Sequence, residues 1–266
     1  MPVITKISVQ QQNKERYNIY LDGQYAFSVD EEVLARYGLK KGKELNELDL
    51  TEIRYHDEIR KGVNVAVQFL AHRMRSEKEV MDHLKKKEWD DTIIQEVMHK
   101  LREYQYVNDE QFAQAFVQTQ WNTTDKGTER IQRELREKGI AESIIERTMT
   151  TIDSADEWER AMKLAEKWAQ KHASLSELMI RRKVEEALLR KGYPSSIVRD
   201  VLSELVIEKC EEEEWEAVKK EGDKAHRRYS KYDGYVYEQK MKQALYRKGF
   251  SMEWIERYLS YRQEEE

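Results

Sequence analysis

Basic residues grouped along this 266-residue sequence are the side chains whose chemistry points most directly to a ligand. Lysine and arginine neutralise phosphate groups and acidic protein surfaces, so a cluster of them is a candidate contact for either. The candidate contact residues for nucleic acid or an acidic partner are Lys85, Lys86, Lys87, Arg181, Arg182, Lys183, Arg227, Arg228, Lys231, Arg247 and Lys248.

A structural role competes with ligand binding at these clusters. Residues 85–87 and 247–248 lie where helices are expected to end, and a cation there is stabilised by the negative end of the helix dipole. Residues 181–183 and 227–228 lie inside expected helices, where the competing interpretation is a solvated surface side chain. Both interpretations stay open.

The C-terminal part of the chain combines cations with aromatic residues. Residues 219–262 contain 12 lysines and arginines against 6 aspartates and glutamates. The aromatic residues at 250, 254 and 258 match apolar positions elsewhere in the chain and are expected in a core. Tyr229, Tyr232, Tyr235 and Tyr237 fall in an expected connection. Because bases stack on aromatic rings while cations neutralise phosphates, this segment predicts weak, salt-sensitive nucleic-acid binding.

No reactive constellation accompanies these residues in the sequence. The motifs GxxxxGK(S/T), GxGxxG, HExxH and GxSxG do not occur. The six histidines lack the short spacings of metal ligands, and the single cysteine, Cys210, lies beside carboxylates and is expected to be inert. We therefore expect a protein that is not an enzyme and that binds no cofactor or metal.

Composition indicates fold class and compartment. Charged residues make up 37% of the chain, which has 10 glycines and 2 prolines. Since proline breaks helices, this composition predicts a mainly α fold. Glutamate runs at 211–214 and 264–266 account for much of the net charge of −5. A single cysteine, no signal-peptide pattern and no long apolar run predict a cytoplasmic protein without membrane contact.

Residues 1–58 are expected to form a small N-terminal α/β domain. Alternating apolar residues predict a strand near 3–9, and two further strands flank Asp22-Gly23, which suits a type I′ hairpin turn. Asp30 is placed to cap a short helix, and Gly38 can close it. The sequence thus predicts a three-stranded sheet with one helix.

From about residue 59 one template occurs four times. Leu84, Leu135, Leu188 and Leu245 lie 51, 53 and 57 residues apart. Each of these leucines precedes a basic helix end. Glycine follows at 139, 192 and 249, where it can end the helix in the left-handed backbone conformation. In the first copy, Glu88 stands in place of this glycine. We expect three helices per copy, in repeat 1 (59–107), repeat 2 (108–155), repeat 3 (156–206) and repeat 4 (207–266). Such arrays are elongated and curved.

Two segments of this array, YVNDEQFAQAFV at 106–117 and KGTERIQRELREKGI at 126–140, resemble the RecX family, regulators of the RecA recombinase. The stretch YNIYLDG at 17–23 is similar to the N-terminal extension of Gram-positive members. The resemblance implies tandem three-helix repeats that bind in the helical groove of the RecA–DNA filament. It also implies modulation, mostly inhibition, of recombinase and coprotease activity, without catalysis by the regulator. Compact members have three repeats, whereas this chain has four.

Two functions stay open on these grounds. The first is a monomeric regulator whose partner is the RecA filament and which binds single-stranded or double-stranded DNA weakly. The alternative is a helical-repeat module that binds single-stranded DNA or RNA and has no recombinase partner. The basic, aromatic repeat 4 is the feature that favours the alternative.

Overall fold

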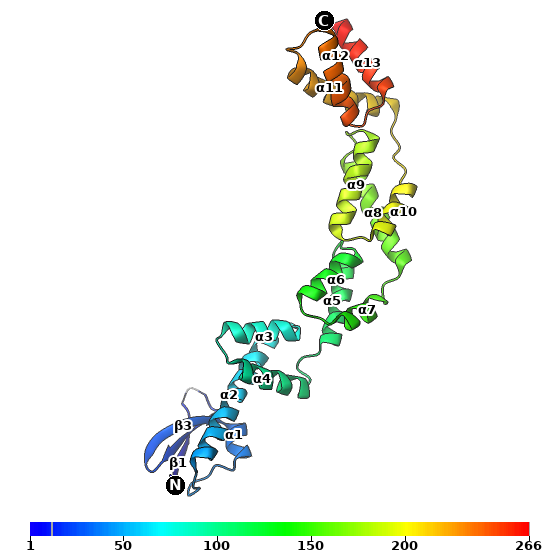
Figure 1. Ribbon diagram of the computed structural model, residues 1–266. Helices are drawn as coiled ribbons and strands as arrows, with labels where there is room; N and C mark the ends of the chain where they lie inside the picture. Colours follow the sequence, from blue (N-terminus) through cyan, green and yellow to red (C-terminus); the bar gives the residue numbers. More distant parts are fainter. Residues whose placement is uncertain (12, 266) are drawn as a thin grey trace. The chain divides into compact units, whose positions relative to one another are not determined.

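The computed structural model describes residues 1–11 and 13–265 of the chain (Figure 1). This part is mainly helical with one small sheet, as predicted. The strands are β1 (Ile4–Val9), β2 (Arg16–Leu21) and β3 (Gln24–Asp30). The helices are α1 (Glu31–Arg36), α2 (Glu47–Leu70), α3 (Glu77–Lys86), α4 (Asp91–Glu103), α5 (Asp109–Thr123), α6 (Thr128–Glu137), α7 (Glu142–Met149), α8 (Ser154–Lys171), α9 (Glu177–Lys191), α10 (Ser195–Glu204), α11 (Glu211–Tyr229), α12 (Gly234–Arg247) and α13 (Met252–Glu265).

The chain divides into two compact units. The first contains Met1–Ala115 with Leu135–Ile144, and the second contains Phe116–Glu134 with Ile145–Glu266. The sheet and repeat 1 belong to the first unit, repeats 3 and 4 belong to the second, and repeat 2 contributes to both. The elongated, curved course expected for the array stays a prediction.

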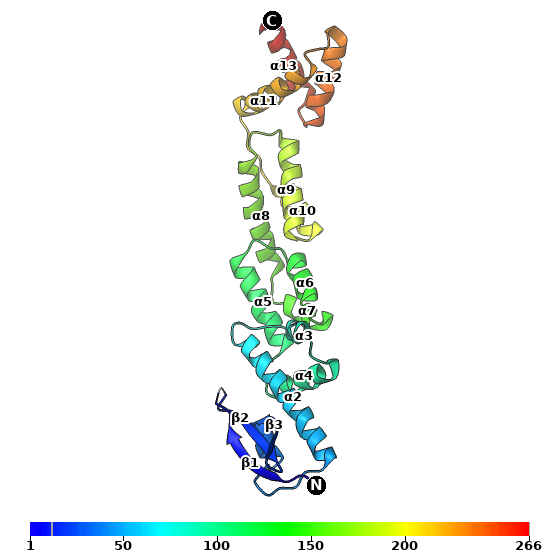
Figure 2. The same ribbon diagram turned by 90° about the vertical axis from the view of Figure 1, so that its left-hand side faces the viewer.

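The N-terminal sheet is antiparallel with strand order β1-β2-β3 (Figure 2). Its hairpin turns at Asp22 and Gly23, whose φ angles are 48° and 88°. The Asp30 carboxylate accepts a hydrogen bond from the backbone N–H of Glu32 at 3.1 Å and caps α1, and Gly38 follows that helix with a φ of 52°. The predicted hairpin, cap and helix end are confirmed.

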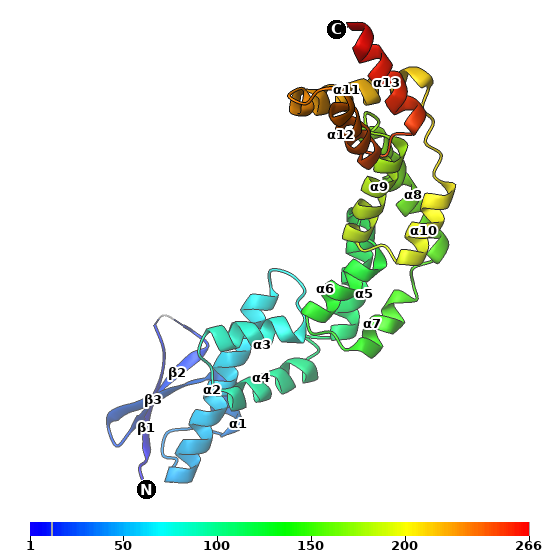
Figure 3. The same cartoon turned by 45° about the horizontal axis from the view of Figure 1, so that its top comes forward.

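Helix α2 carries the chain from this sheet into repeat 1. Its first half packs on the sheet, where Ile53 is fully buried in a core with Ile4, Ile19 and Leu45. Its second half packs with α3 and α4 (Figure 3). One uninterrupted helix therefore crosses residue 58, where the sequence places the domain boundary.

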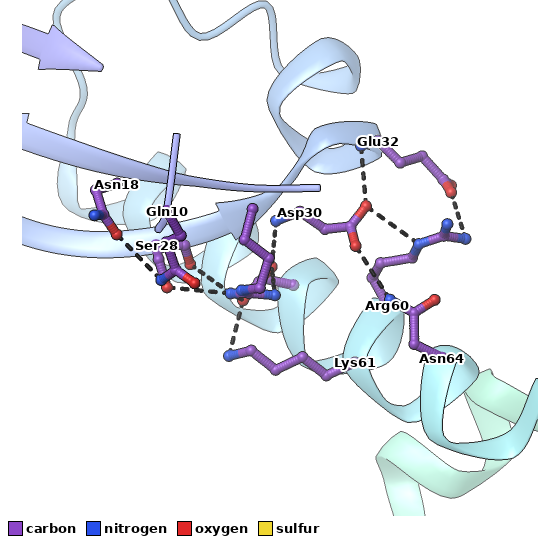
Figure 4. Close-up of polar contacts among 10 residues, drawn as sticks. Gln10, Asn18, Ser28, Asp30, Glu32, Arg60, Lys61 and Asn64 are labelled. Carbon is purple, nitrogen blue, oxygen red and sulfur yellow. Dashed lines mark hydrogen bonds and ion pairs between the residues drawn. The ribbon is translucent and has the colours of Figure 1, made fainter. Parts of the chain in front are cut away.

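A buried ionic network fastens the sheet to α2 (Figure 4). Asp57 of α2 is 2% exposed. Its carboxylate accepts hydrogen bonds from the Arg16 guanidinium and from the backbone N–H of Asp30, each at 2.8 Å, and lies 2.8 Å from Lys61. Asn64 in turn donates to the Asp30 carboxylate at 3.2 Å. Because a buried carboxylate is costly without partners, this network holds the strand ends in one position on α2.

The apolar positions of the template form the cores of the repeats. Val80 and Leu84 are fully buried in repeat 1, and Val184 and Leu188 are fully buried in repeat 3. In repeat 4 the core contains Met241, Leu245, Phe250, Ile255 and Tyr258, with Trp254 packed against it. The repeat pattern and the core role of the aromatic residues at 250, 254 and 258 are confirmed.

The second helix of one repeat begins against the end of the second helix of the next repeat. In the first unit, the Ser76 hydroxyl at the start of α3 donates to the Lys138 carbonyl beyond α6 at 2.8 Å. In the second unit, the backbone N–H of Gly127 before α6 donates to the Lys191 carbonyl of α9 at 3.0 Å. Ser176, which precedes α9, donates likewise to the Lys248 carbonyl beyond α12. These bonds satisfy carbonyls that a helix end leaves without intrahelical partners.

The repeat glycines serve this junction as well as the helix caps. Their φ angles are 80° at 139, 85° at Gly192 and 82° at Gly249, so the predicted left-handed caps are confirmed. A Cβ atom at Gly192 would lie 2.4 Å from Cβ of Arg130, and one at Gly249 would lie 2.7 Å from Cβ of Leu178. Each glycine therefore leaves the space that the neighbouring helix start occupies. In repeat 1, Glu88 takes a φ of 62° and is exposed.

We expect Gly192→Ala to lower the free energy of unfolding by about 2 kcal/mol or more, since alanine strains the left-handed cap and collides with Arg130. Glu88→Gly should raise the free energy of unfolding by about 1 kcal/mol, because glycine adopts the left-handed conformation without strain and position 88 is exposed. Urea unfolding followed by circular dichroism measures both changes. Equal midpoints for Gly192→Ala and the unmodified protein would contradict the proposed junction.

Asp57 should make stability depend on acid pH. Burial disfavours its charge, but the hydrogen bonds from Arg16, Lys61 and the Asp30 backbone outweigh burial and hold the pKa of Asp57 below its usual value. A carboxylate whose folded-state pKa is lowered stabilises the fold above its unfolded pKa, and this stabilisation is lost as the pH falls through the folded value.

We therefore expect Asp57→Asn to lower the free energy of unfolding by about 2–4 kcal/mol at pH 7. The difference from the unmodified protein should shrink as the pH falls from about 5 towards 2. Urea midpoints across this range provide the measurement, with the exposed Asp82→Asn as the matched control. A constant difference at every pH would show that the ionised carboxylate is not what stabilises the fold.

Candidate nucleic-acid contact surface

The lysines at 85–87 lie at the end of α3, exposed as a contact role requires. Lys85 forms an ion pair with Asp91 at 3.1 Å. Beside them, the rings of Phe69 and His83 stack with centroids 3.8 Å apart, and the Arg75 guanidinium lies 3.8 Å from the Phe69 ring centroid. We call Phe69, Arg75 and His83 the repeat 1 cluster.

The electrostatics of the repeat 1 cluster are those of a cationic surface. Burial lowers the pKa of His83, and the positive charges of Lys87, Arg75 and Lys86 lower it further. Burial is the larger cause, and the smaller contributions show that three cations lie close enough to the His83 ring to act on it, where a phosphate or carboxylate would be stabilised.

Arg181 of repeat 3 closes the end of another helix. Its guanidinium donates to the Leu202 carbonyl of α10 at 2.7 Å and to the Leu205 carbonyl at 3.3 Å, and it pairs with Glu177 at 2.9 Å. Its neighbour Arg182 is exposed, and Lys183 pairs with Glu186 at 2.8 Å. The three adjacent cations therefore have different surroundings.

Repeat 3 has its own aromatic ring beneath cations. Trp168 and His172 stack at the end of α8 with centroids 5.4 Å apart. Lys171 and Arg190 lie 5.0 and 5.6 Å from the Trp168 ring centroid. Burial lowers the pKa of His172, with smaller contributions from Lys171 and Lys183. Trp168, Lys171, His172 and Arg190 are the repeat 3 cluster.

Repeat 4 places cations on two tyrosine rings. Lys240 of α12 lies 5.9 Å from the Tyr229 centroid and 4.6 Å from the Tyr232 centroid. Arg228 lies 5.6 Å from Tyr229, and Lys231 lies 5.3 Å from Tyr232. These five residues are the repeat 4 cluster, and they combine the predicted candidates at 228 and 231 with an unpredicted lysine.

The remaining candidates of repeat 4 lie outside this cluster. Arg227 and Arg247 are exposed, and Lys248 pairs with the nearly buried Glu221 at 3.2 Å. Of the four tyrosines predicted in a connection, Tyr232 lies in one; Tyr229 is the last residue of α11, and Tyr235 and Tyr237 belong to α12, which already begins at Gly234. Tyr235 is 74% exposed, whereas Tyr237 packs against the core of the repeat.

Repeats 3 and 4 share part of their basic–aromatic arrangement at equivalent positions. A shift of 57 residues relates Leu188 to Leu245, and the same shift relates Lys171 to Arg228 and Lys183 to Lys240. By the same shift, His172 corresponds to Tyr229. In both repeats, therefore, an aromatic ring lies near two cations at the end of the first helix. The sequence carried this signal as a shared spacing, although Phe69, Arg75, Trp168 and Lys240 were not predicted as contact residues.

The described residues contain neither a candidate metal centre nor a helix suited to a membrane. Among residues 1–11 and 13–265, no three histidine, cysteine or acidic side chains come together in a way that would hold a metal ion. In the same part of the chain, no helix has the length and apolar character needed to cross a membrane.

Family models match the chain along most of its length. Residues 2–46 match the N-terminal domain of the regulatory protein RecX, residues 63–101 match the first three-helix domain of RecX, and residues 108–149 match the second. The third three-helix domain of RecX matches twice, at 155–202 and 211–259. The double match agrees with the 57-residue correspondence between repeats 3 and 4.

Individual relatives extend this similarity to the full chain. The regulatory protein RecX of Bacillus velezensis is 48% identical and that of Bacillus subtilis is 46% identical, each over 267 residues that cover both chains completely. A crystal structure of regulatory protein RecX covers 77% of this chain and 100% of its own, with a TM-score of 0.70 at 35% identity. RecX from Lactobacillus salivarius covers 56% of this chain and 97% of its own, with a TM-score of 0.53 at 33% identity.

The different surroundings of adjacent cations predict different effects of their removal. Arg181→Ala should lower the free energy of unfolding by about 1–2 kcal/mol, because the carbonyls at the end of α10 lose a charged donor. Arg182→Ala, its matched control, should change the free energy of unfolding by no more than about 0.5 kcal/mol. Urea unfolding monitored by circular dichroism tests both variants. An equal effect of the two substitutions would show that Arg181 does not stabilise α10.

Proposed function

Because the chain belongs to the RecX family of regulatory proteins, we propose that it binds the RecA–DNA filament and modulates recombinase and coprotease activity, mostly by inhibition. It does so without catalysis of its own and acts in the cytoplasm as a monomer. The observation that carries the proposal is the recurrence of basic–aromatic clusters in repeats 1, 3 and 4 of a chain built from family repeats.

A filament suits such a chain because both are periodic. A nucleoprotein filament presents phosphates and acidic side chains repeatedly along its length, and tandem repeats present contact residues repeatedly along theirs. Each cluster would contribute a modest, salt-sensitive contact, and several linked contacts give a tight complex through effective concentration. Release by salt is therefore expected, although the chain has a net charge of −5.

The repeat 4 cluster supports the second candidate function, a single-strand binding module that has no recombinase partner. Lys240 lies over two tyrosine rings, and Lys231 and Arg228 flank them, which is the combination of stacking faces and cations that single strands bind. The two functions differ in what they require, since a single-strand module binds an oligonucleotide tightly when RecA is absent.

We expect the purified protein, added to RecA on circular single-stranded DNA, to lower the rate of DNA-dependent ATP hydrolysis at or below one molecule per recombinase protomer. The double variant Lys231→Ala with Lys240→Ala should need about tenfold more protein, because it removes two phosphate contacts. Lys40→Ala with Lys41→Ala, two exposed lysines of the N-terminal domain, is the matched control and should behave as the unmodified protein.

An unchanged hydrolysis rate and an unchanged filament length at stoichiometric protein would contradict the proposal. Fluorescence anisotropy with a labelled oligonucleotide, in the absence of RecA, separates the alternative. Tight binding there, together with no effect on the recombinase, would favour the single-strand module.

A further inference from the structure

A polar pocket lies in the second unit, between the end of α5, the connection that follows it and one face of α8. Among the charged residues of its lining, cations outnumber acids. Arg160, Lys163 and Lys167 line it from α8, while Asp125 is the acidic residue in the lining and lies 3.9 Å from Lys191 outside it. None of these residues belongs to the basic–aromatic clusters.

The three cations share a face of α8 because of their spacing. Positions three and seven residues after Arg160 fall on the same side of an α-helix, so Lys163 and Lys167 project towards the same pocket. Lys163 is 75% exposed and makes a long contact of 3.8 Å with the exposed Glu159, so it is available to a ligand. Like charges held together repel one another, and a bound anion would relieve that repulsion.

Arg160 is held in place as a rigid element of this pocket. Its guanidinium lies 4.2 Å from the Trp121 ring centroid and donates to the Thr124 carbonyl at 2.6 Å. Its Nε atom is buried without a hydrogen-bond partner among the described residues. Because that atom is shielded from solvent, an oxyanion in the pocket would contact the terminal nitrogens of the guanidinium instead. A preorganised guanidinium also loses little conformational freedom when it binds.

We propose that this pocket binds a phosphate group. Arg160 supplies a fixed guanidinium that matches phosphate oxygens, and Lys163 and Lys167 supply mobile charges at the entrance. The phosphate can come from a nucleic-acid strand or from a free nucleotide, and the chemistry of the pocket is the same for both. The inference stands apart from the proposed function, because phosphate binding here requires no recombinase.

The test compares the double variant Lys163→Ala with Lys167→Ala against the control Lys40→Ala with Lys41→Ala. Both remove two exposed lysines, and circular dichroism checks that both fold. Inorganic phosphate and ADP are titrated into 15N-labelled protein while the backbone amide resonances of residues 122–125 are followed. A labelled thymidine 20-mer is titrated separately at several salt concentrations, with anisotropy as the readout.

In the unmodified protein and the control, we expect inorganic phosphate to shift the resonances of residues 122–125, and the double variant should lose this response. If the pocket holds a strand phosphate, the double variant also binds the 20-mer more weakly, and its slope of log affinity against log salt falls by about 0.7 for each phosphate that is no longer neutralised. If the pocket holds a nucleotide, ADP saturates it in the unmodified protein and the 20-mer affinity stays unchanged. Equal responses of the double variant and the control to all three probes would overturn the proposal.

Discussion

The structure depends on the contact between the start of one repeat's second helix and the end of the next repeat's second helix. A small three-helix repeat has a limited core, so its helix ends need partners that the repeat itself does not supply. Ser76 and Ser176 supply them as side-chain donors, and Gly127 supplies one through its backbone. The glycines beyond α9 and α12 make the approach possible, since a Cβ at either would lie within 3 Å of the neighbouring helix start. A single glycine in the left-handed conformation thus ends one helix and leaves room for the start of the neighbouring helix.

The basic residues divide according to what they contact. Arg16 and Arg181 serve the fold, because their guanidinium groups bind the buried Asp57 carboxylate and the carbonyls at the end of α10. Lys240 rests on aromatic rings at the surface, where a phosphate or carboxylate can still be bound. Net charge says nothing about this division. A chain with a formal charge of −5 can therefore carry local cationic surfaces along its repeats.

Local signals in the sequence predicted much of the fold, whereas contacts between distant residues were not predictable. The hairpin at Asp22, the glycine caps and the four repeats followed from turn chemistry and spacing. The course of α2 across residue 58 did not, because its first half is stabilised by the sheet it packs on and by Asp57. The carbonyls that accept from Arg181 lie 21 and 24 residues away in sequence. The sequence alone therefore does not distinguish the role of Arg181 from that of its neighbour Arg182. The clusters were predicted in part: Arg228, Lys231 and the tyrosines at 229 and 232 were candidates, whereas the rings and cations of the repeat 1 and repeat 3 clusters were not.

The most direct test of the regulatory account is amide hydrogen exchange of the chain, alone and saturated with RecA filaments on single-stranded DNA. The account predicts slower exchange where the first helix of a repeat ends and the second begins, at the clusters of repeats 1, 3 and 4. The outer surface of the N-terminal sheet provides an internal reference. Unchanged exchange at all three clusters in the presence of saturating filament would contradict the claim that these repeats bind it.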